Sequence, residues 1–387
     1  MVLGDANKYE GVPLTFASRW KSLNNQVVDL LLLGDTHTIE REVKESSTGA
    51  GFSFSTPYNY DGMVYLGTKS YVDCAEAQKR YGDCLSLKIC AGEASTHHSF
   101  LQKAFPSDYF KLGSTLDDII TMLFNQECNV LAFDKSAILS TASSEEAISR
   151  GYVLGTQMKT KEPLAIVTRN SDRVFSDVVN WVLQALLFGE EQGLSRDPAR
   201  CHNYSGSTEL SLHSATDLNF MNAIYCVGNY GEIISSLPID KRGMNEINDG
   251  STGMLYAIPF GNLDTEESAE PSAANTMEKI RRKGKLNCGI VIPEWMDGRI
   301  TVRSHHKSMG TLYCQTLAAA LLNGNPKAVK FVMCDESELN SYISLANGEV
   351  DVLVGGAIQR RYDFERSASL GGFHFSTPYY YGDEGPG

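Results

Sequence analysis

The stretch from residue 27 to residue 60 reads VVDLLLLGDTHTIEREVKESSTGAGFSFSTPYNY. It opens with an apolar run whose length suits one buried strand of a parallel sheet. The run ends in a small polar segment that holds Thr36 and Thr38, and Arg41 follows on what the pattern predicts to be the first turn of a helix. Ligands of open α/β sheets bind at the carboxyl ends of the strands. A forked, permanently charged guanidinium beside two hydroxyls indicates a site for an anionic group.

The same stretch recurs near the other end of the chain. Residues 350–356 read VDVLVGG and residues 372–379 read GFHFSTPY, against VDLLLLG at 28–34 and GFSFSTPY at 51–58. The first two blocks are 322 residues apart and the second two are 321 apart. A strand, a glycine break and an FxFSTPY motif in the same order at nearly one spacing predict an internal repeat. A period of this length is typical of whole domains in tandem, so the chain of 387 residues holds one repeat and part of the next.

Composition narrows the class of protein. The net charge of −13 argues against nucleic acid and anionic membranes as partners. No apolar run approaches the ~20 residues that span a bilayer, so no membrane span is predicted. Nine cysteines without zinc-site spacing favour an oxidising compartment. The first residues lack the features of a signal peptide, so we expect an extracellular or periplasmic protein whose signal lies outside this chain.

Predicted strands and helices alternate along the chain, which indicates an α/β fold with a parallel sheet. A strand that crosses between lobes is predicted at residues 62–67, and another strand at 130–133 ends at Asp134. Ser114 is the predicted N-cap of an amphipathic helix. Residues 261–275, GNLDTEESAEPSAAN, are acidic and small with no apolar period, and they are the predicted linker.

Taken together, these segments resemble the extracellular solute-binding proteins of family 3, most closely the branch that binds polar amino acids in general. The matching segments run through residues 1–260 and include CNVLAFD at 128–134, KEPL at 161–164, GEEQG at 189–193 and VGNYGEI at 227–233. The last part of the chain, from residue 277 onward, resembles the opening segment of that family.

The resemblance implies two α/β lobes, joined by two crossing strands, that close on a free amino acid. It also implies a permuted chain with a partial second repeat. The expected parts are an incomplete first-lobe opening segment at 1–65, the second lobe at 66–163, the first-lobe closing segment at 164–260, the linker at 261–275 and the opening segment of the next repeat at 276–387.

The resemblance also assigns the ligand contacts. Thr36, Thr38 and Arg41 are expected to hold the α-carboxylate, and Asp134 on the other lobe to hold the α-ammonium. Burying both ligand charges is costly unless each meets a partner, so closure is favourable only with a zwitterion present. Ser95 is the fifth expected contact, in a hydroxyl-rich turn of the second lobe.

That turn reads Glu93-Ala94-Ser95, so two of the three hydroxyls of the family pattern are absent, and Glu93 favours a ligand with a cationic side chain. The resemblance implies no enzyme activity, cofactor or metal. The adjacent His97 and His98 project in different directions, so they are not expected to share a metal. Expected disulfides are Cys288–Cys314 and Cys90–Cys128, with Cys84–Cys128 as the alternative to the latter.

The second copy departs from the site pattern. Ile358 and Asp363 stand 322 residues after Thr36 and Arg41, so a site completed by residues 350–387 is expected to bind amino acids poorly. This leaves a second function open: a structural bead of an extracellular filament or matrix. Such beads would be linked head to tail by exchange of repeat segments between neighbouring copies, with ligand binding weakened or lost.

Overall fold

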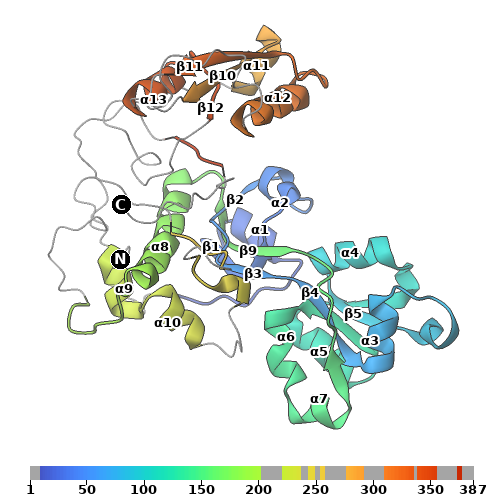
Figure 1. Ribbon diagram of the computed structural model, residues 1–387. Coiled ribbons are helices and arrows are strands. Elements are labelled where there is room, and N and C mark those ends of the chain that lie inside the picture. The colour runs from blue at the N-terminus through green and yellow to red at the C-terminus, as the bar shows by residue number, and fades with distance from the viewer. Residues whose placement is uncertain are drawn as a thin grey trace. The chain divides into compact units, whose positions relative to one another are not determined.

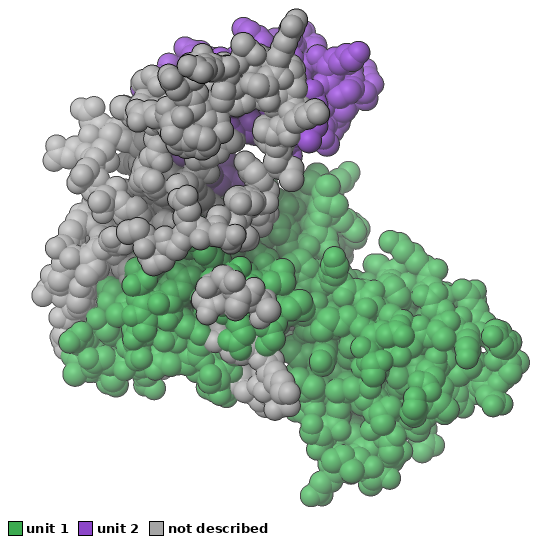
Figure 2. All heavy atoms as spheres, viewed as in Figure 1, with its two compact units in different colours: residues 1–257, 383–387 green, residues 258–382 purple. Residues whose placement is uncertain are grey.

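The chain divides into two compact units, residues 1–257 with 383–387, and residues 258–382 (Figure 2). The boundary lies close to the predicted linker, which is itself outside the described residues. The computed structural model describes residues 9–201, 220–236, 243–248, 253–257, 276–291, 309–334, 338–354 and 373–376.

The first sheet of unit 1 is built around one long strand. Its strand order is β1-β9-β2, and β3 also pairs with β9. All these pairs are antiparallel. Helix α1 (Arg19–Asn24) packs on this sheet, with Trp20 and Leu23 in contact with the buried Leu31, Phe52 and Val167. The strands are β1 (Leu30–Thr36), β2 (Phe52–Phe54), β3 (Asn59–Asp61) and β9 (Glu162–Arg169).

The second sheet of unit 1 has the order β6-β5-β7-β4-β8. Helices α3 (Lys69–Glu76) and α4 (Thr96–Ala104) cover one face through Val72 and Leu101. Helices α5 (Leu116–Phe124) and α6 (Lys135–Ala142) cover the other through Ile119 and Ile138 (Figure 1). The strands are β4 (Met63–Thr68), β5 (Ile89–Gly92), β6 (Phe110–Gly113), β7 (Val130–Asp134) and β8 (Tyr152–Leu154).

The prediction of a parallel sheet is only partly right. Strand β5 is parallel to β6 and β7, but β4 is antiparallel to β7 and β8. The reason is that β4 is a crossing strand: β3 pairs in the first sheet, and β4 enters the second sheet two residues later. The return crossing leads into β9, which begins at Glu162 opposite Asp61. Two α/β lobes joined by two crossing strands are thereby confirmed, with β4 at the position predicted for residues 62–67.

The remaining elements of unit 1 complete the two lobes. Helix α5 begins one residue later than predicted, because Thr115 and Asp118 form a capping box in which each side chain accepts a hydrogen bond from the other's backbone N–H. Within the described part of the chain, no helix combines the length and apolar character needed to cross a membrane. The other elements are α2 (Ile39–Lys44), α7 (Glu145–Ser149), α8 (Arg173–Glu191), α9 (Phe220–Val227), α10 (Tyr230–Ser235), and the 3-10 turns η1 (Gly82–Ser86), η2 (Ser107–Tyr109) and η3 (Gly243–Asn245).

Unit 2 has a three-stranded sheet with its own core. The order is β11-β10-β12, and both pairs are parallel. Ile280, Leu286, Ile290 and Val354 pack there around Cys288 and Cys314. The elements are α11 (Thr276–Lys283), β10 (Leu286–Val291), α12 (Met309–Leu321), β11 (Val329–Cys334), α13 (Glu338–Ala346) and β12 (Val352–Val354).

Each of the two units contains at least one disulfide bond of its own. The expected pairs Cys90–Cys128 and Cys288–Cys314 are confirmed. The alternative Cys84–Cys128 is wrong, because η1 brings Cys84 to Cys74 at the end of α3, with a Cα–Cα distance of 5.6 Å. A further bond, Cys201–Cys226, was not predicted.

Candidate functional site

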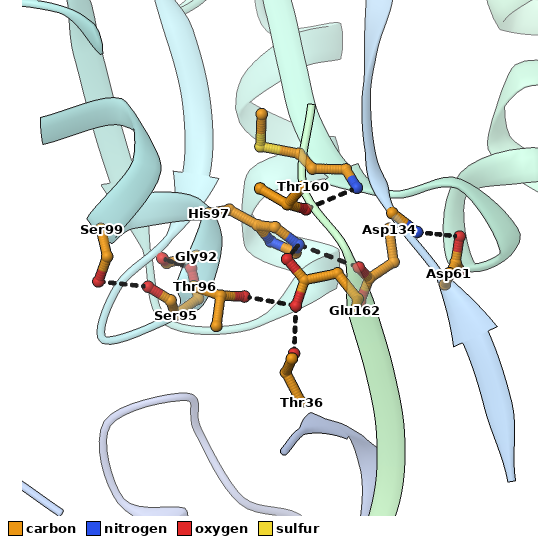
Figure 3. Close-up of polar contacts among 12 residues, drawn as sticks. Thr36, Asp61, Gly92, Ser95, Thr96, His97, Ser99, Asp134, Thr160 and Glu162 are labelled. Atoms are coloured by element: carbon orange, nitrogen blue, oxygen red, sulfur yellow. Dashed lines mark hydrogen bonds and ion pairs between the residues drawn. The ribbon is translucent and has the colours of Figure 1, made fainter. Parts of the chain in front are cut away.

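A buried polar cluster lies where the two lobes and the return crossing meet (Figure 3). Thr36 ends β1, Glu162 begins β9, and Thr96 is the first residue of α4. The hydroxyl of Thr36 donates to Oε2 of Glu162, and the hydroxyl of Thr96 donates to the same oxygen at 3.0 Å. Glu162 therefore joins the carboxyl end of a first-lobe strand to the helix start of the second lobe.

His97 lies between two carboxylates. Its Nε2 is 3.0 Å from Oδ1 of Asp134, the last residue of β7, and 4.0 Å from Oε1 of Glu162. All three side chains are buried. Burial lowers the pKa of His97, but Asp134 and Glu162 outweigh it, so the net shift of the pKa is upward. The ring is thus held between two carboxylates, with a hydrogen bond between its Nε2 and Asp134.

The turn before α4 fixes these positions. Ala94 has a φ of +49°, a left-handed conformation that directs the chain from β5 into the helix. Ser95 then caps the helix: its hydroxyl accepts from the backbone N–H of His98 at 3.1 Å and donates to the carbonyl of Gly92 at 2.6 Å. As a result, the hydroxyl of Ser95 is engaged in the turn, and Thr96 is the residue that contacts the cluster.

Arg41 is one of the two buried arginines among the described residues of the first lobe, the other being Arg19. It lies in α2, which Thr38 caps by accepting from the backbone N–H of Arg41 at 3.3 Å. The guanidinium donates to the carbonyl of Thr36 at 2.8 Å and lies 5.0 Å from the Trp20 ring centroid. Burial, together with the nearby Arg19, lowers the pKa of Arg41 to about 10, so the side chain stays charged at neutral pH.

An ion pair supports this part of the site. Arg19 donates to Oδ1 of Asp35 at 2.7 Å, and both side chains are buried. Oδ2 of Asp35 has no hydrogen-bond partner within the described part of the chain, where it is fully buried. Asp35 also raises the pKa of Arg41, against the larger effect of burial. The Arg19–Asp35 pair and Arg41 together carry one excess positive charge in this part of the first lobe.

The arrangement can hold a cation. His97, Asp134 and Glu162 each offer one ligand atom, and these atoms lie within 4.8 Å of one another, a set that is also able to ligate a metal ion. The 3.0 Å contact between His97 and Asp134 is already an ordinary charge-assisted hydrogen bond. The neighbouring His98 packs elsewhere: its ring makes a T-shaped contact with Phe110. Two buried carboxylates beside one imidazole suit a cationic group.

The five residues predicted for the site are distributed as follows. Thr36, Arg41 and Asp134 are buried in or beside the cluster, whereas the hydroxyls of Thr38 and Ser95 cap α2 and α4. Sequence reasoning missed Thr96, His97 and Glu162. For Glu162, the sequence did offer a signal, because an acidic residue at the start of an apolar strand is a candidate site residue. Ile358 and Asp363, the counterparts in the second copy, lie outside the described residues.

Known proteins similar to this chain are binding proteins of transporters. No family model matches the chain. The glutamate/glutamine/aspartate/asparagine-binding protein of Rhodobacter capsulatus is 27% identical over 289 residues, which cover 67% of this chain and 80% of that protein. The general L-amino acid-binding periplasmic protein of Rhizobium johnstonii is 27% identical over 288 residues, with 67% and 79% covered.

A solved structure shows the same fold. A periplasmic binding protein of an ABC transporter from Brucella ovis, with glutathione bound, superposes with a TM-score of 0.55 at 23% identity, over 67% of this chain and 84% of that one. The homologues of this chain are therefore the binding proteins of amino-acid ABC transporters, of the family 3 solute-binding type. The predicted resemblance to amino-acid-binding solute-binding proteins is confirmed, and the tandem repeat stays a prediction.

Proposed function

We propose that unit 1 binds a free amino acid in the periplasm or outside the cell, as a binding protein and not as an enzyme. The observation that carries the proposal is the buried cluster, which has an excess negative charge at Asp134 and Glu162 and a buried guanidinium at Arg41. Two relatives whose names describe amino-acid binding support the same function.

Opposite charges at two ends of one site suit a zwitterion. In this proposal Asp134 and Glu162 accept hydrogen bonds from the α-ammonium, next to His97. Arg41, with Thr36 and Thr38 beside it, holds the α-carboxylate, while Ser95 shapes the turn that presents Thr96. Each ligand charge then meets an opposite charge, which offsets the cost of removing it from water.

Thermal unfolding with each of the twenty amino acids at millimolar concentration tests this function. A ligand at 100 times its dissociation constant adds about 2.7 kcal/mol to the free energy of unfolding, which raises Tm by several degrees. Asp134→Asn is expected to lose this response, while Asp108→Asn, at an exposed position of the same lobe, keeps it. If no amino acid raises the Tm of the parent, or if Asp134→Asn responds like the parent, the proposal fails.

We also infer that the chain is a tandem repeat divided at 1–65, 66–163, 164–260, 261–275 and 276–387. Local geometry supports the spacing. Gln26 has a φ of +62° just after α1, and Gly348, 322 residues later, has a φ of +69° just after α13. The hydrogen bonds that end the two helices match as well: Val27 N to Ser22 O at 2.9 Å, and Glu349 N to Ser344 O at 2.9 Å.

An aromatic pair follows the same spacing. The rings of Trp20 and Phe52 are 5.2 Å apart, and those of Tyr342 and Phe373, their counterparts in the repeat, are 4.9 Å apart. A contact that recurs between corresponding helix and strand positions favours two copies of one domain type. The recurring contact therefore supports a second candidate function, a structural bead whose binding partners are neighbouring copies of the same repeat.

A further inference from the structure

Among the described residues, strand β1 pairs with another strand along only one of its two edges, and its other edge is called the open edge. The strand lies at the end of the β1-β9-β2 order, with β9 on its paired side. Leu32, in the middle of this strand, is 55% exposed. Ile39 and Val43 on the following helix, α2, are 81% and 69% exposed. An unpaired strand edge with exposed large apolar side chains is a typical site for pairing with another chain.

The repeat shows what covers this strand in its second copy. Strand β12 is the counterpart of residues 30–32, and it pairs in parallel with β10. Val354, the counterpart of Leu32, is only 6% exposed because it packs with Ile290 and Cys314. The same position is therefore buried where it packs on β10 and α12, and exposed in β1, which has no such neighbour among the described residues.

The aspartate that precedes the strand also differs in burial between the two copies. Asp351 has a fully buried side chain that accepts from the backbone N–H of Asn287 at 2.8 Å, and its own N–H donates to the carbonyl of Asn287 at 2.8 Å. Lys283 Nζ lies 3.7 Å from its other oxygen. Its counterpart Asp29 is 81% exposed and lies 3.4 Å from Arg169. Asp29 is therefore an aspartate at an exposed edge, while the same residue type in the second copy is buried and hydrogen-bonded to the neighbouring strand.

We propose that the open edge of β1 binds β10 and α12 of a second copy of this chain, in the way that β12 pairs with β10 and packs on α12 in its own unit. Strand β10 of the second copy then runs parallel to β1, and α12 covers Leu32. The register follows from unit 2: Cys288 opposite Leu30, Gly289 opposite Leu31 and Ile290 opposite Leu32. Asn287 pairs with Asp29.

The contact is an exchange of equivalent strands. Strand β10 already carries β11 on one edge and β12 on the other, so β1 takes the place of β12. Strand β1 then makes the pairing with β10 that β12 makes in unit 2. Leu30 and Leu32 of β1 stand where β12 has Val352 and Val354, and these larger side chains favour the exchanged pair. Because each copy offers one β1 and one β10, the contacts run head to tail and extend into an open assembly.

This inference rests on the tandem-repeat part of the proposed function and is independent of amino-acid binding. Sedimentation of the full chain over a hundredfold range of concentration tests it. We expect dimers and longer species that grow with concentration. Leu32→Lys, which places a charge in the contact, is expected to weaken association at least tenfold. Leu85→Lys, at a 66% exposed leucine of the second lobe, is the matched control and associates like the parent.

A cross-link checks the register. A chain with Asp29→Cys is mixed with a chain with Asn287→Cys, both in a Cys334→Ala background, and oxidised mildly. A disulfide between the two chains is expected, and none when Asp83→Cys, an exposed control of the second lobe, replaces Asp29→Cys.

Three results would overturn the proposal: a parent that stays monomeric, a Leu32→Lys variant that associates like the parent, or a chain with both Asp29→Cys and Asn287→Cys that closes only on itself. The thermal response to amino acids, measured on the same samples, reports separately on the ligand site.

Discussion

His97 sets the charge balance of the candidate site, and its titration is measurable. Asp134 and Glu162 together outweigh the effect of burial and raise the pKa of His97 above its ordinary value of 6.5. A raised pKa in the folded state stabilises the protein below pH 6.5 and loses that contribution as the pH rises through the folded value. We therefore expect the free energy of unfolding of the unliganded parent to fall over this window.

His97→Gln is expected to lack that fall, because glutamine keeps a hydrogen-bond donor but does not titrate. The measurement is urea unfolding at a series of pH values, with the difference between parent and variant as the readout. Since Asp61 and Asp177 also have raised pKa values from burial, only this difference isolates His97. Parallel curves for the two proteins would show that the imidazolium contributes nothing.

In the proposed site, the shape of the Arg41 side chain is expected to matter as much as its charge. One arm of the guanidinium is held by the carbonyl of Thr36, which leaves the rest of the fork for a ligand carboxylate. Arg41→Lys keeps the charge but not the fork. We expect it to reduce amino-acid affinity about tenfold or more, since a charged hydrogen bond contributes about 1.5–3 kcal/mol.

Isothermal titration of the parent and the variant with the amino acid found in the thermal scan measures this loss. Arg196→Lys, at an exposed position of unit 1, is the matched control and is expected to bind like the parent. Equal affinities for Arg41→Lys and the parent would remove Arg41 from the site.

At the scale of single elements, α5 offers a clean test of local sequence signals. Thr115→Ala removes the capping box with Asp118 and is expected to lower the free energy of unfolding by about 1 kcal/mol. Thr121→Ala, at an exposed position inside the same helix, is expected to change it little. Urea unfolding of both variants gives the comparison, and equal stabilities would show that the cap contributes nothing.

Elements with a local signal were predictable from sequence, and long-range contacts were not. The apolar run and the polar break after it predicted a strand that ends near Thr36. The strand is present as β1, but it pairs antiparallel with β9 and leaves Leu32 exposed, so the prediction of a buried parallel strand is wrong. By contrast, Glu162 meets Thr36 across 126 residues of sequence, and nothing local in KEPL points to that partner. Ser95, predicted as a ligand contact, caps α4 after the left-handed Ala94, and the residues that follow it, Thr96 and His97, lie in the cluster. Side-chain roles in a turn depend on backbone angles that residue types alone leave open.

At the scale of the whole molecule, the candidate site belongs to one unit. Thr36, Arg41, Thr96, Asp134 and Glu162 all lie in unit 1. Unit 2 has its own sheet, its own apolar core and a disulfide, Cys288–Cys314, inside that core. A unit with a separate core can unfold in a separate transition. A ligand that binds only unit 1 then stabilises only unit 1.

We therefore expect calorimetry of the dilute chain to show two unfolding transitions, of which an amino-acid ligand raises only one. The double variant Cys288→Ala/Cys314→Ala identifies the other. Its missing cross-link, 26 residues apart in sequence, is expected to cost unit 2 about 3–4 kcal/mol and to lower that transition alone. A single transition that moves as a whole with both the ligand and the double variant would mean that the two units fold as one, and that binding in unit 1 stabilises the entire chain.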